Sequence, residues 1–297
     1  MTWAGAPPPP RPRLGMRDWF RVARRGVPLV ATVFGGLVLL LAVRLVERPL
    51  FGLRRPVTPW ITQAVCKAAF FWLGMRRVCR GRPLTGLGAA VANHVSWLDI
   101  FALNAGKRIY FVSKSEVAGW PGIGWLARAT GTVFIRRDAR DAAAQKAVIE
   151  ARLRAGHRLM FFPEGTSTDG RQVLGFKPTL FAAFFSDGLP DLQVQPVTLA
   201  YRAPRDAAAT FYGWWGDMSF GGHALAMLAA RRHGRVEVIY HPPLPVAQFA
   251  DRKALARAAQ SAVRAGLLAD GSVDGAGDPP PDLREGTDRT TVSAGGP

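Results

Sequence analysis

The chain has 297 residues, and 48% of them are hydrophobic, which is enough for one large domain or two small ones. Its 39 lysines and arginines exceed its 21 acidic residues, and the net charge of +18 suits nucleic acid, anionic lipid or an acidic carrier protein as a partner. The two cysteines, Cys66 and Cys79, lack metal-ligand spacing and argue against a disulfide scaffold. The basic residues form no recognisable binding module, so we expect no nucleic acid partner.

The N-terminal part of the chain combines a basic arm with an apolar segment. Residues 1–26 are rich in proline and arginine and are predicted to be disordered. Residues 27–43 carry no charge, which is at the short limit for a transmembrane helix. Residues 60–74 are apolar and aromatic, and are a candidate partner in the membrane interface. Residues 27–80 are therefore predicted to be a membrane-embedded helical segment, with a buried core helix as the alternative. Arginines on both flanks leave its orientation open.

The rest of the chain alternates between strand-like and helix-like runs. This alternation predicts an α/β fold over residues 81–268, with a mixed, partly parallel sheet flanked by helices. Residues 269–297 are rich in Gly, Pro, Asp, Ser and Thr and are predicted to be a disordered tail. The predicted strands are residues 89–92, 109–113, 132–135, 158–162, 194–201 and 235–240, and the predicted helices are residues 97–105, 122–129, 138–155, 178–186, 223–230 and 251–268.

A histidine and an aspartate lie five residues apart directly after the first of these strands. Because five residues of one helix turn through about 500°, His94 and Asp99 can meet only if His94 lies in a loop and Asp99 in the first turn of the next helix. Ser96 is a suitable N-cap for that helix, and Asp99 then falls at its N3 position. Asp99 can hold one imidazole nitrogen while the other takes a proton from a substrate hydroxyl. The alternative is a helix cap beside an ordinary loop histidine.

Two further strand ends carry polar groups. Residues 159–166 end in F-P-E-G-T, where Pro163 stops the strand and Gly165 allows a ligand to approach the backbone. This pattern indicates a polar-ligand site, with an ordinary turn as the alternative. Residues 132–137 form a strand that ends in Arg136 and Arg137, which suits either phosphate binding or a solvated strand end.

The predicted strand at residues 194–201 contains Pro196. Since proline lacks the N–H that a sheet ladder needs, this strand is interpreted as an edge strand or as a strand with a deliberate break.

Taken together, the four motifs resemble the glycerolipid acyltransferase family typified by bacterial 1-acyl-glycerol-3-phosphate acyltransferases, over about residues 85–245. That family shows N-H-x-S-x-x-D, F-I-x-R, F-P-E-G-T and a proline-containing strand in this order. The resemblance implies that His94 is the general base and that Asp99 orients it. It also implies that no metal or cofactor is needed. The residues it assigns to the acceptor are Arg137 for the phosphate, the loop Glu164, Gly165 and Thr166, and Pro196 of the last motif.

One position departs from the family pattern. Many lysophosphatidate acyltransferases have arginine after E-G-T, whereas this chain has Ser167, which removes one cation for a phosphate dianion. The surrounding sequence resembles a subgroup that includes lyso-ornithine lipid acyltransferases. Arg136, Arg171 and Lys177 are candidates to restore positive charge near the acceptor.

The resemblance implies acyl transfer from a thioester of acyl carrier protein or coenzyme A to a lysolipid hydroxyl. The expected acceptor is 1-acyl-sn-glycerol-3-phosphate, giving phosphatidic acid, and lyso-ornithine lipid is the alternative. A catalytically silent membrane scaffold and a basic nucleic-acid binder are the rivals from other classes. We expect the enzyme at the bacterial inner membrane, inserted as a hairpin or monotopically, with its catalytic domain on the cytoplasmic face. Residues 117–126 either line an acyl-chain groove or pack in the core.

Overall fold

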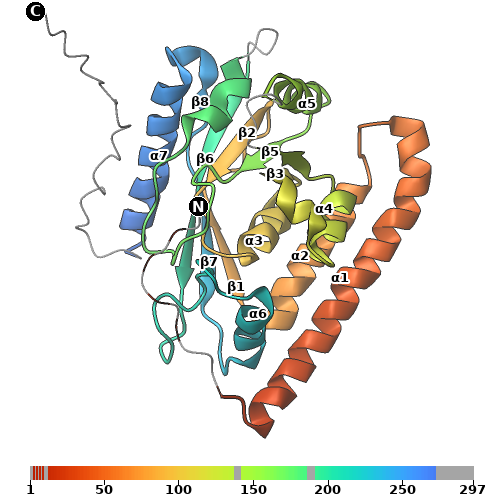
Figure 1. Ribbon diagram of the computed structural model, residues 1–297, viewed down its shortest axis with the longest axis vertical. Coiled ribbons are helices and arrows are strands. Elements are labelled where there is room, and N and C mark those ends of the chain that lie inside the picture. The colour runs from red at the N-terminus through yellow and green to blue at the C-terminus, as the bar shows by residue number, and fades with distance from the viewer. Residues whose placement is uncertain are drawn as a thin grey trace, which may run out of the picture.

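The computed structural model describes residues 13–136, 142–185 and 191–271, together with residues 3, 5, 7 and 9. It confirms the α/β class, with helices on both faces of one mixed sheet (Figure 1). The strands are β1 (Arg76–Arg80), β2 (Gly88–Ala92), β3 (Tyr110–Lys114), β4 (Val133–Ile135), β5 (Leu159–Phe161), β6 (Gln193–Arg202), β7 (Arg235–Tyr240) and β8 (Leu244–Pro245). The α-helices are α1 (Met16–Phe51), α2 (Thr58–Leu73), α3 (Leu98–Gly106), α4 (Ile123–Thr130), α5 (Ala142–Arg154), α6 (Phe220–Ala229) and α7 (Arg252–Ala269).

The sheet has the strand order β1-β7-β6-β2-β5-β3-β4, and β8 pairs with β6 outside this path. Strands β2 to β6 are parallel to their neighbours in this set, whereas β7 runs antiparallel to β6, and β1 is parallel to β7. The carboxyl ends of β2, β5 and β6 therefore meet at one edge of the sheet, which is where ligands bind in open α/β folds.

Each face of the sheet packs against its own layer of helices. Val194 of β6 belongs to the cluster formed with α7 and the 3-10 helix η3 (Pro178–Phe185). Val197 and Leu199 of the same strand belong to the opposite cluster, which α2 and α3 complete. This alternation follows from the two-residue period of a strand. In place of the helix predicted at residues 178–186, the structure has the 3-10 helix η3 up to Phe185, and residue 186 lies outside the described residues. The predicted start of α5 also lies outside them.

Two boundaries at the N-terminal end differ from the prediction. Helix α1 begins at Met16, so residues 16–26 are helical where the sequence predicted a disordered arm. The reason is tertiary, because Arg21 Nε donates to Ala229 O at 2.8 Å and Arg25 Nη1 donates to Leu228 O at 2.9 Å. These arginines satisfy the open carbonyls at the end of α6, where positive charge is favourable. Strand β1, predicted as part of the membrane segment, belongs to the sheet as its edge strand.

Helix α1 lies along the body of the protein and is joined to it near both ends. Its N-terminal arginines bind α6, and near its other end Glu47 Oε1 accepts the N–H groups of Val57 and Thr58 at 2.7 and 3.1 Å, at the start of α2. Between these points Gly36 packs closely on Val65 of α2, where an added Cβ would lie 2.4 Å from the valine. Its 36 residues extend over about 54 Å.

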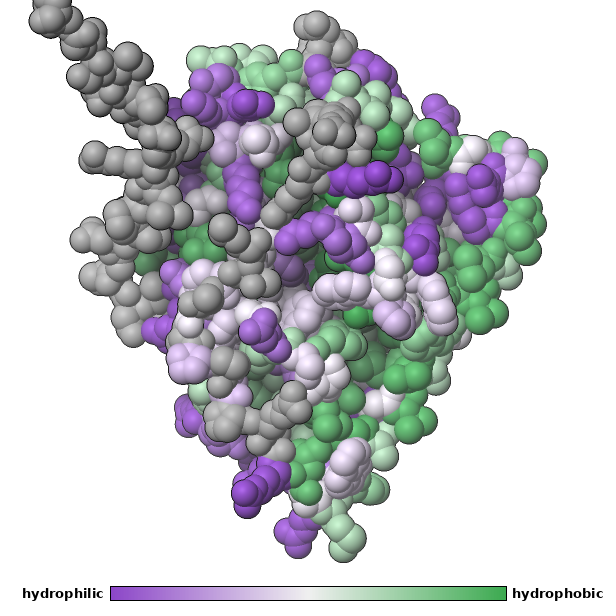
Figure 2. Space-filling model, in the orientation of Figure 1, coloured by the Kyte–Doolittle hydropathy of each residue, from purple (hydrophilic) through white to green (hydrophobic). Residues whose placement is uncertain are grey.

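The opposite side of α1 is an exposed apolar stripe. Its members recur every three or four residues and are Val27, Val30, Phe34, Val38, Leu41 and Leu45. Figure 2 shows hydrophobic surface gathered along the side of the molecule that α1 occupies. Among the described residues α1 is the one helix long and apolar enough to cross a membrane.

Candidate active site

The site is built on the turn that follows β2. Asn93 leaves the strand, and its buried amide bonds to both backbone groups of Leu199 on β6. Nδ2 donates to the carbonyl at 2.9 Å, and Oδ1 accepts the N–H at 2.8 Å. The side chain thereby continues the β2–β6 ladder beyond the pair Ala92 and Val197. This attachment fixes where the His94 turn starts.

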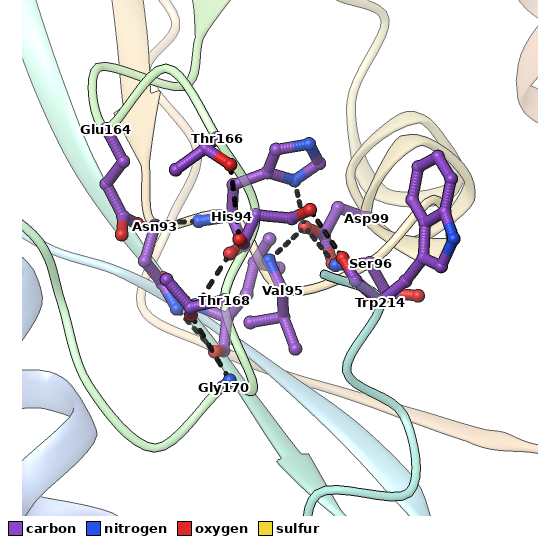
Figure 3. Close-up of polar contacts among 12 residues, drawn as sticks. Asn93, His94, Val95, Ser96, Asp99, Glu164, Thr166, Thr168, Gly170 and Trp214 are labelled. Atoms are coloured by element: carbon purple, nitrogen blue, oxygen red, sulfur yellow. Dashed lines mark hydrogen bonds and ion pairs between the residues drawn. The ribbon is translucent and has the colours of Figure 1, made fainter. Parts of the chain in front are cut away.

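His94 and Asp99 meet as the spacing predicts (Figure 3). His94 lies in the loop, Asp99 lies in the first turn of α3, and Nδ1 is 2.7 Å from Asp99 Oδ2. The imidazole stacks on Phe162 with ring centroids 4.1 Å apart and planes inclined by 16°. Its second nitrogen points away from the carboxylate, and the side chain is 21% exposed. The ring is therefore held on two sides, and its Nε2 lies on the side away from Asp99.

Asp99 is fully buried and has hydrogen-bond donors on both oxygens. Besides the imidazole, Oδ2 accepts the N–H of Val95 at 2.8 Å and of Ser96 at 3.1 Å, and Oδ1 accepts the hydroxyl of Tyr201 at 2.7 Å. The predicted capping by the Ser96 hydroxyl is wrong. Ser96 Oγ is buried without a hydrogen-bond partner, because the Asp99 carboxylate takes the N–H groups ahead of the helix.

Glu164 of the F-P-E-G-T motif fixes the turn from the side of β5. Its Oε1 accepts His94 N–H at 2.8 Å, and its Oε2 accepts Leu174 N–H at 3.0 Å. Burial, with only 2% of the residue exposed, raises the pKa of Glu164 to about 8, and the two N–H bonds oppose this rise. Backbone N–H groups therefore use both oxygens and tie Glu164 to the turn, and contact of Glu164 with the acceptor stays a prediction.

The three residues after Glu164 each form a hydrogen bond. Gly165 has a φ of +70°, which glycine adopts without strain, and its N–H donates to Phe162 O at 3.0 Å. Thr166 Oγ1 accepts the N–H of Trp3 at 3.4 Å, and Ser167 Oγ donates to the Trp214 carbonyl.

Two loops also bind the backbone of the turn itself. Thr168 N–H donates to His94 O at 3.0 Å, and Trp214 N–H donates to Val95 O at 2.9 Å. The turn is therefore bound by the loop after β5 and by the loop after β6.

The structure describes three of the four predicted basic residues. Arg136 is exposed at the end of β4, Lys177 is exposed beyond the F-P-E-G-T loop, and Arg171 is half-buried. Arg137 lies outside the described residues.

Pro196 is buried in β6 opposite Val91. The prediction of an edge strand is wrong, since β6 lies between β7 and β2. The proline is tolerated because the strand pairing is interrupted beside it, in the gap between β7 and β8, so no ladder N–H is needed there. Its carbonyl accepts His241 N–H from this gap at 3.0 Å.

Sequence reasoning assigned no role to Tyr201 or Trp214. One feature of the sequence could have identified Tyr201. Its polar hydroxyl stands at the carboxyl end of β6, after a run of buried residues. No group of three or more His, Cys, Asp and Glu able to hold a metal occurs in the described parts of the chain.

Comparison with known proteins identifies this arrangement. A family model described as acyltransferase matches residues 85–200, which contain the His94–Asp99 turn and the F-P-E-G-T loop. A lyso-ornithine lipid O-acyltransferase of Rhodobacter capsulatus is 57% identical over 268 residues, covering 89% of this chain and 96% of the relative. Another, of Pseudomonas aeruginosa, is 37% identical, with coverage of 84% and 94%.

The crystal structure of the 1-acyl-sn-glycerophosphate acyltransferase PlsC of Thermotoga maritima shares the fold, with a TM-score of 0.60 and 21% identity. The match covers 86% of this chain and 97% of that one. The fold and the motifs therefore define an acyltransferase. The chain belongs to the acyltransferase family, and the resemblance predicted from its motifs is confirmed.

Proposed function

We propose that this enzyme transfers a fatty acyl group from the thioester of acyl carrier protein or coenzyme A to the free hydroxyl of lyso-ornithine lipid. The observation that carries the reaction is the buried Asp99 carboxylate 2.7 Å from His94 Nδ1, with Nε2 left for substrate. The near-complete coverage of the Rhodobacter capsulatus relative supports this acceptor over 1-acyl-sn-glycerol-3-phosphate.

In this mechanism His94 Nε2 takes the hydroxyl proton as the acceptor oxygen attacks the thioester carbon. The C–O bond forms, the C–S bond breaks, and the imidazolium returns its proton to the leaving sulfur. Asp99 keeps the Nδ1–H tautomer in place and stabilises the imidazolium that forms between these two steps.

Direct transfer, without an acyl-enzyme intermediate, agrees with the positions of two candidate nucleophiles, Ser96 and Cys66. Ser96 Oγ is fully buried beneath the turn, and Cys66 is buried in the core, where burial raises the pKa of its thiol to about 12. Neither side chain is placed to form an acyl-enzyme intermediate, which needs an activated nucleophile beside a base.

Ser167 supports an acceptor without a phosphate. Its hydroxyl binds the Trp214 carbonyl, so the loop after β6 is attached at the position that follows E-G-T. Trp214 itself packs on Trp120 and Phe220, with ring centroids 6.2 and 6.3 Å apart. The headgroup of lyso-ornithine lipid carries a carboxylate and an amine, and it therefore has less need of a fixed arginine than a phosphate dianion has.

The arrangement of α1 supports monotopic insertion at the cytoplasmic face of the inner membrane. A helix that crossed the bilayer would carry along the elements to which it is joined, and Arg25 near one end and Glu47 near the other are both attached to the protein body. The exposed stripe on its outer side suits a helix lying in the plane of the interface. Thioester donors and the catalytic domain are then on the same side.

The test uses purified full-length protein, labelled acyl carrier protein or coenzyme A thioesters, and a panel of lysolipid acceptors. We expect acylation of lyso-ornithine lipid with a kcat/KM at least tenfold above that for 1-acyl-sn-glycerol-3-phosphate. Preference for the phosphate acceptor would overturn the proposed acceptor, and absence of transfer to every acceptor would overturn the reaction.

A further inference from the structure

We propose that Tyr201 is a positioning residue of the acyl transfer, which acts by holding the Asp99 carboxylate in the orientation that His94 needs. This inference rests on the proposed function only through the role of His94, since it holds for any acceptor hydroxyl. The juxtaposition that carries it is the 2.7 Å hydrogen bond from the Tyr201 hydroxyl to Asp99 Oδ1.

The strand framework brings Tyr201 to this position. The Asn93 amide locks Leu199 of β6 to the start of the His94 turn, and Tyr201 follows two residues later on the same face of the strand. Its hydroxyl therefore reaches Asp99 Oδ1, whereas the imidazole contacts Oδ2 of the same carboxylate.

Hydrogen bonds and the His94 imidazole compensate the charge of Asp99. In residues 13–136, 142–185 and 191–271 no lysine or arginine pairs with it, and its ion-pair partner is His94. Other titratable and charged groups around the turn include Glu164, from the loop after β5, and Tyr212, whose ring centroid lies 5.5 Å from that of Tyr201. Asp169, Arg171, Arg202 and Arg205 line the same cavity as Val95 and Tyr201. Because a buried carboxylate needs donors on both oxygens, the single donor on Oδ1 is important.

Tyr201 remains a donor throughout the working range of pH. Burial and the neighbouring Asp99 charge raise the pKa of its hydroxyl well above the ordinary value, so it stays protonated. That cavity, of about 280 Å³, adjoins it, and Tyr201, Tyr212 and Val95 are among the residues that line it. Loss of the hydroxyl leaves Oδ1 without its protein donor beside this space. The carboxylate is then free to turn, and Oδ2 no longer faces Nδ1 at a fixed angle.

The first test compares Tyr201→Phe with the matched control Tyr212→Phe. Tyr212 is a neighbouring buried tyrosine whose hydroxyl accepts Gly234 N–H at 2.8 Å. We expect Tyr201→Phe to lower kcat by about 10- to 100-fold with little change in KM for the acceptor, as for the loss of one hydrogen bond to a charged group. Tyr212→Phe keeps the wild-type kcat. Equal losses in the two variants, or an unchanged kcat in Tyr201→Phe, would overturn the proposal.

The pH profile separates a positioning role from a merely structural one. Without the tyrosine donor the Asp99 carboxylate turns and stabilises the imidazolium less, so the acidic limb of the kcat/KM profile moves to lower pH in Tyr201→Phe. Tyr201→3-fluorotyrosine keeps the hydroxyl donor and the shape of the side chain, and its limb stays close to the wild-type position. An unshifted limb in Tyr201→Phe, or equal shifts in the two variants, would contradict the inference.

A double-mutant cycle shows whether Tyr201 acts through Asp99. We expect Tyr201→Phe to change kcat less than twofold when added to Asp99→Asn, because the charge on which the tyrosine acts is already gone. Full additivity of the two losses would refute the coupling. If the wild type prefers another lysolipid, the same variants are measured with that acceptor, so failure of the proposed acceptor is distinguished from failure of this inference.

Discussion

Replacing Asp99 by asparagine removes the charge beside His94 while preserving the local hydrogen bonds. Oδ2 accepts three donors, the imidazole and the N–H groups of Val95 and Ser96, so the asparagine oxygen occupies that position. Its amide group then faces Tyr201, whose hydroxyl rotates to accept a hydrogen bond. The Nδ1–H tautomer of His94 is therefore retained, and the main loss is electrostatic.

The size of that loss follows from the geometry. Unit charges about 4 Å apart, with an effective dielectric constant of about 20, attract by about 4 kcal/mol. This is the stabilisation of the imidazolium that disappears, and it corresponds to a fall in kcat of about 1,000-fold. The acceptor KM changes little, because Asp99 is fully buried and does not touch the substrate.

Initial rates at saturating donor and acceptor, measured together with thermal unfolding, check this prediction. Asp99→Ala is the comparison, since it leaves the same buried donors without an acceptor and destabilises the fold by several kcal/mol. The reasoning is refuted if Asp99→Asn retains more than about a tenth of the wild-type kcat. It is also refuted if Asp99→Asn unfolds as early as Asp99→Ala.

Three further predictions concern stability, specificity and membrane binding. Burial raises the pKa of Glu164 to about 8, so the folded protein binds more protons than the unfolded chain between about pH 5 and 8 and loses stability as pH rises through that range. The difference in unfolding free energy between wild type and Glu164→Gln therefore changes with pH, and a constant difference would contradict the raised pKa. Ser167→Arg increases the rate with 1-acyl-sn-glycerol-3-phosphate relative to lyso-ornithine lipid at least tenfold, whereas Ser167→Ala does not. Equal acceptor ratios in the two variants would exclude a specificity role. The triple variant Val30→Ser, Phe34→Ser and Val38→Ser is released from liposomes in a flotation assay. Its unfolding temperature is not lowered, because these side chains are exposed. Unchanged flotation would show that this stripe does not bind lipid.

Local patterns predicted much of the sheet and the catalytic pair. The alternation of short apolar runs with helical patterns reflects burial of β2 and its neighbours on both faces, which has a direct sequence signature. The meeting of His94 and Asp99 was predictable for a similar reason. Their spacing forces a loop before the helix, and the loop and the first turn of α3 are local structure.

Long-range contacts account for what the sequence did not predict. Tyr201 and Asp99 are 102 positions apart, and only the placement of β6 beside β2 brings them together. Arg25 lies in a basic stretch that is typical of a solvated arm. It nevertheless binds carbonyls more than 200 positions away, and this helps extend α1 to Met16. Pro196 suggested a strand edge because sequence alone does not show where a partner strand ends.

The most direct test of the central claim is the rate of acyl transfer to lyso-ornithine lipid by wild type and by His94→Ala, in the same membranes and with the same thioester. The imidazole is partly exposed and stacked on Phe162, so its removal leaves the buried Asn93 and Glu164 attachments of the turn in place. We predict that wild type forms the acylated lipid, and that His94→Ala forms at least 1,000-fold less while unfolding at a similar temperature. Transfer by His94→Ala within tenfold of the wild-type rate would contradict the claim that His94 is the base.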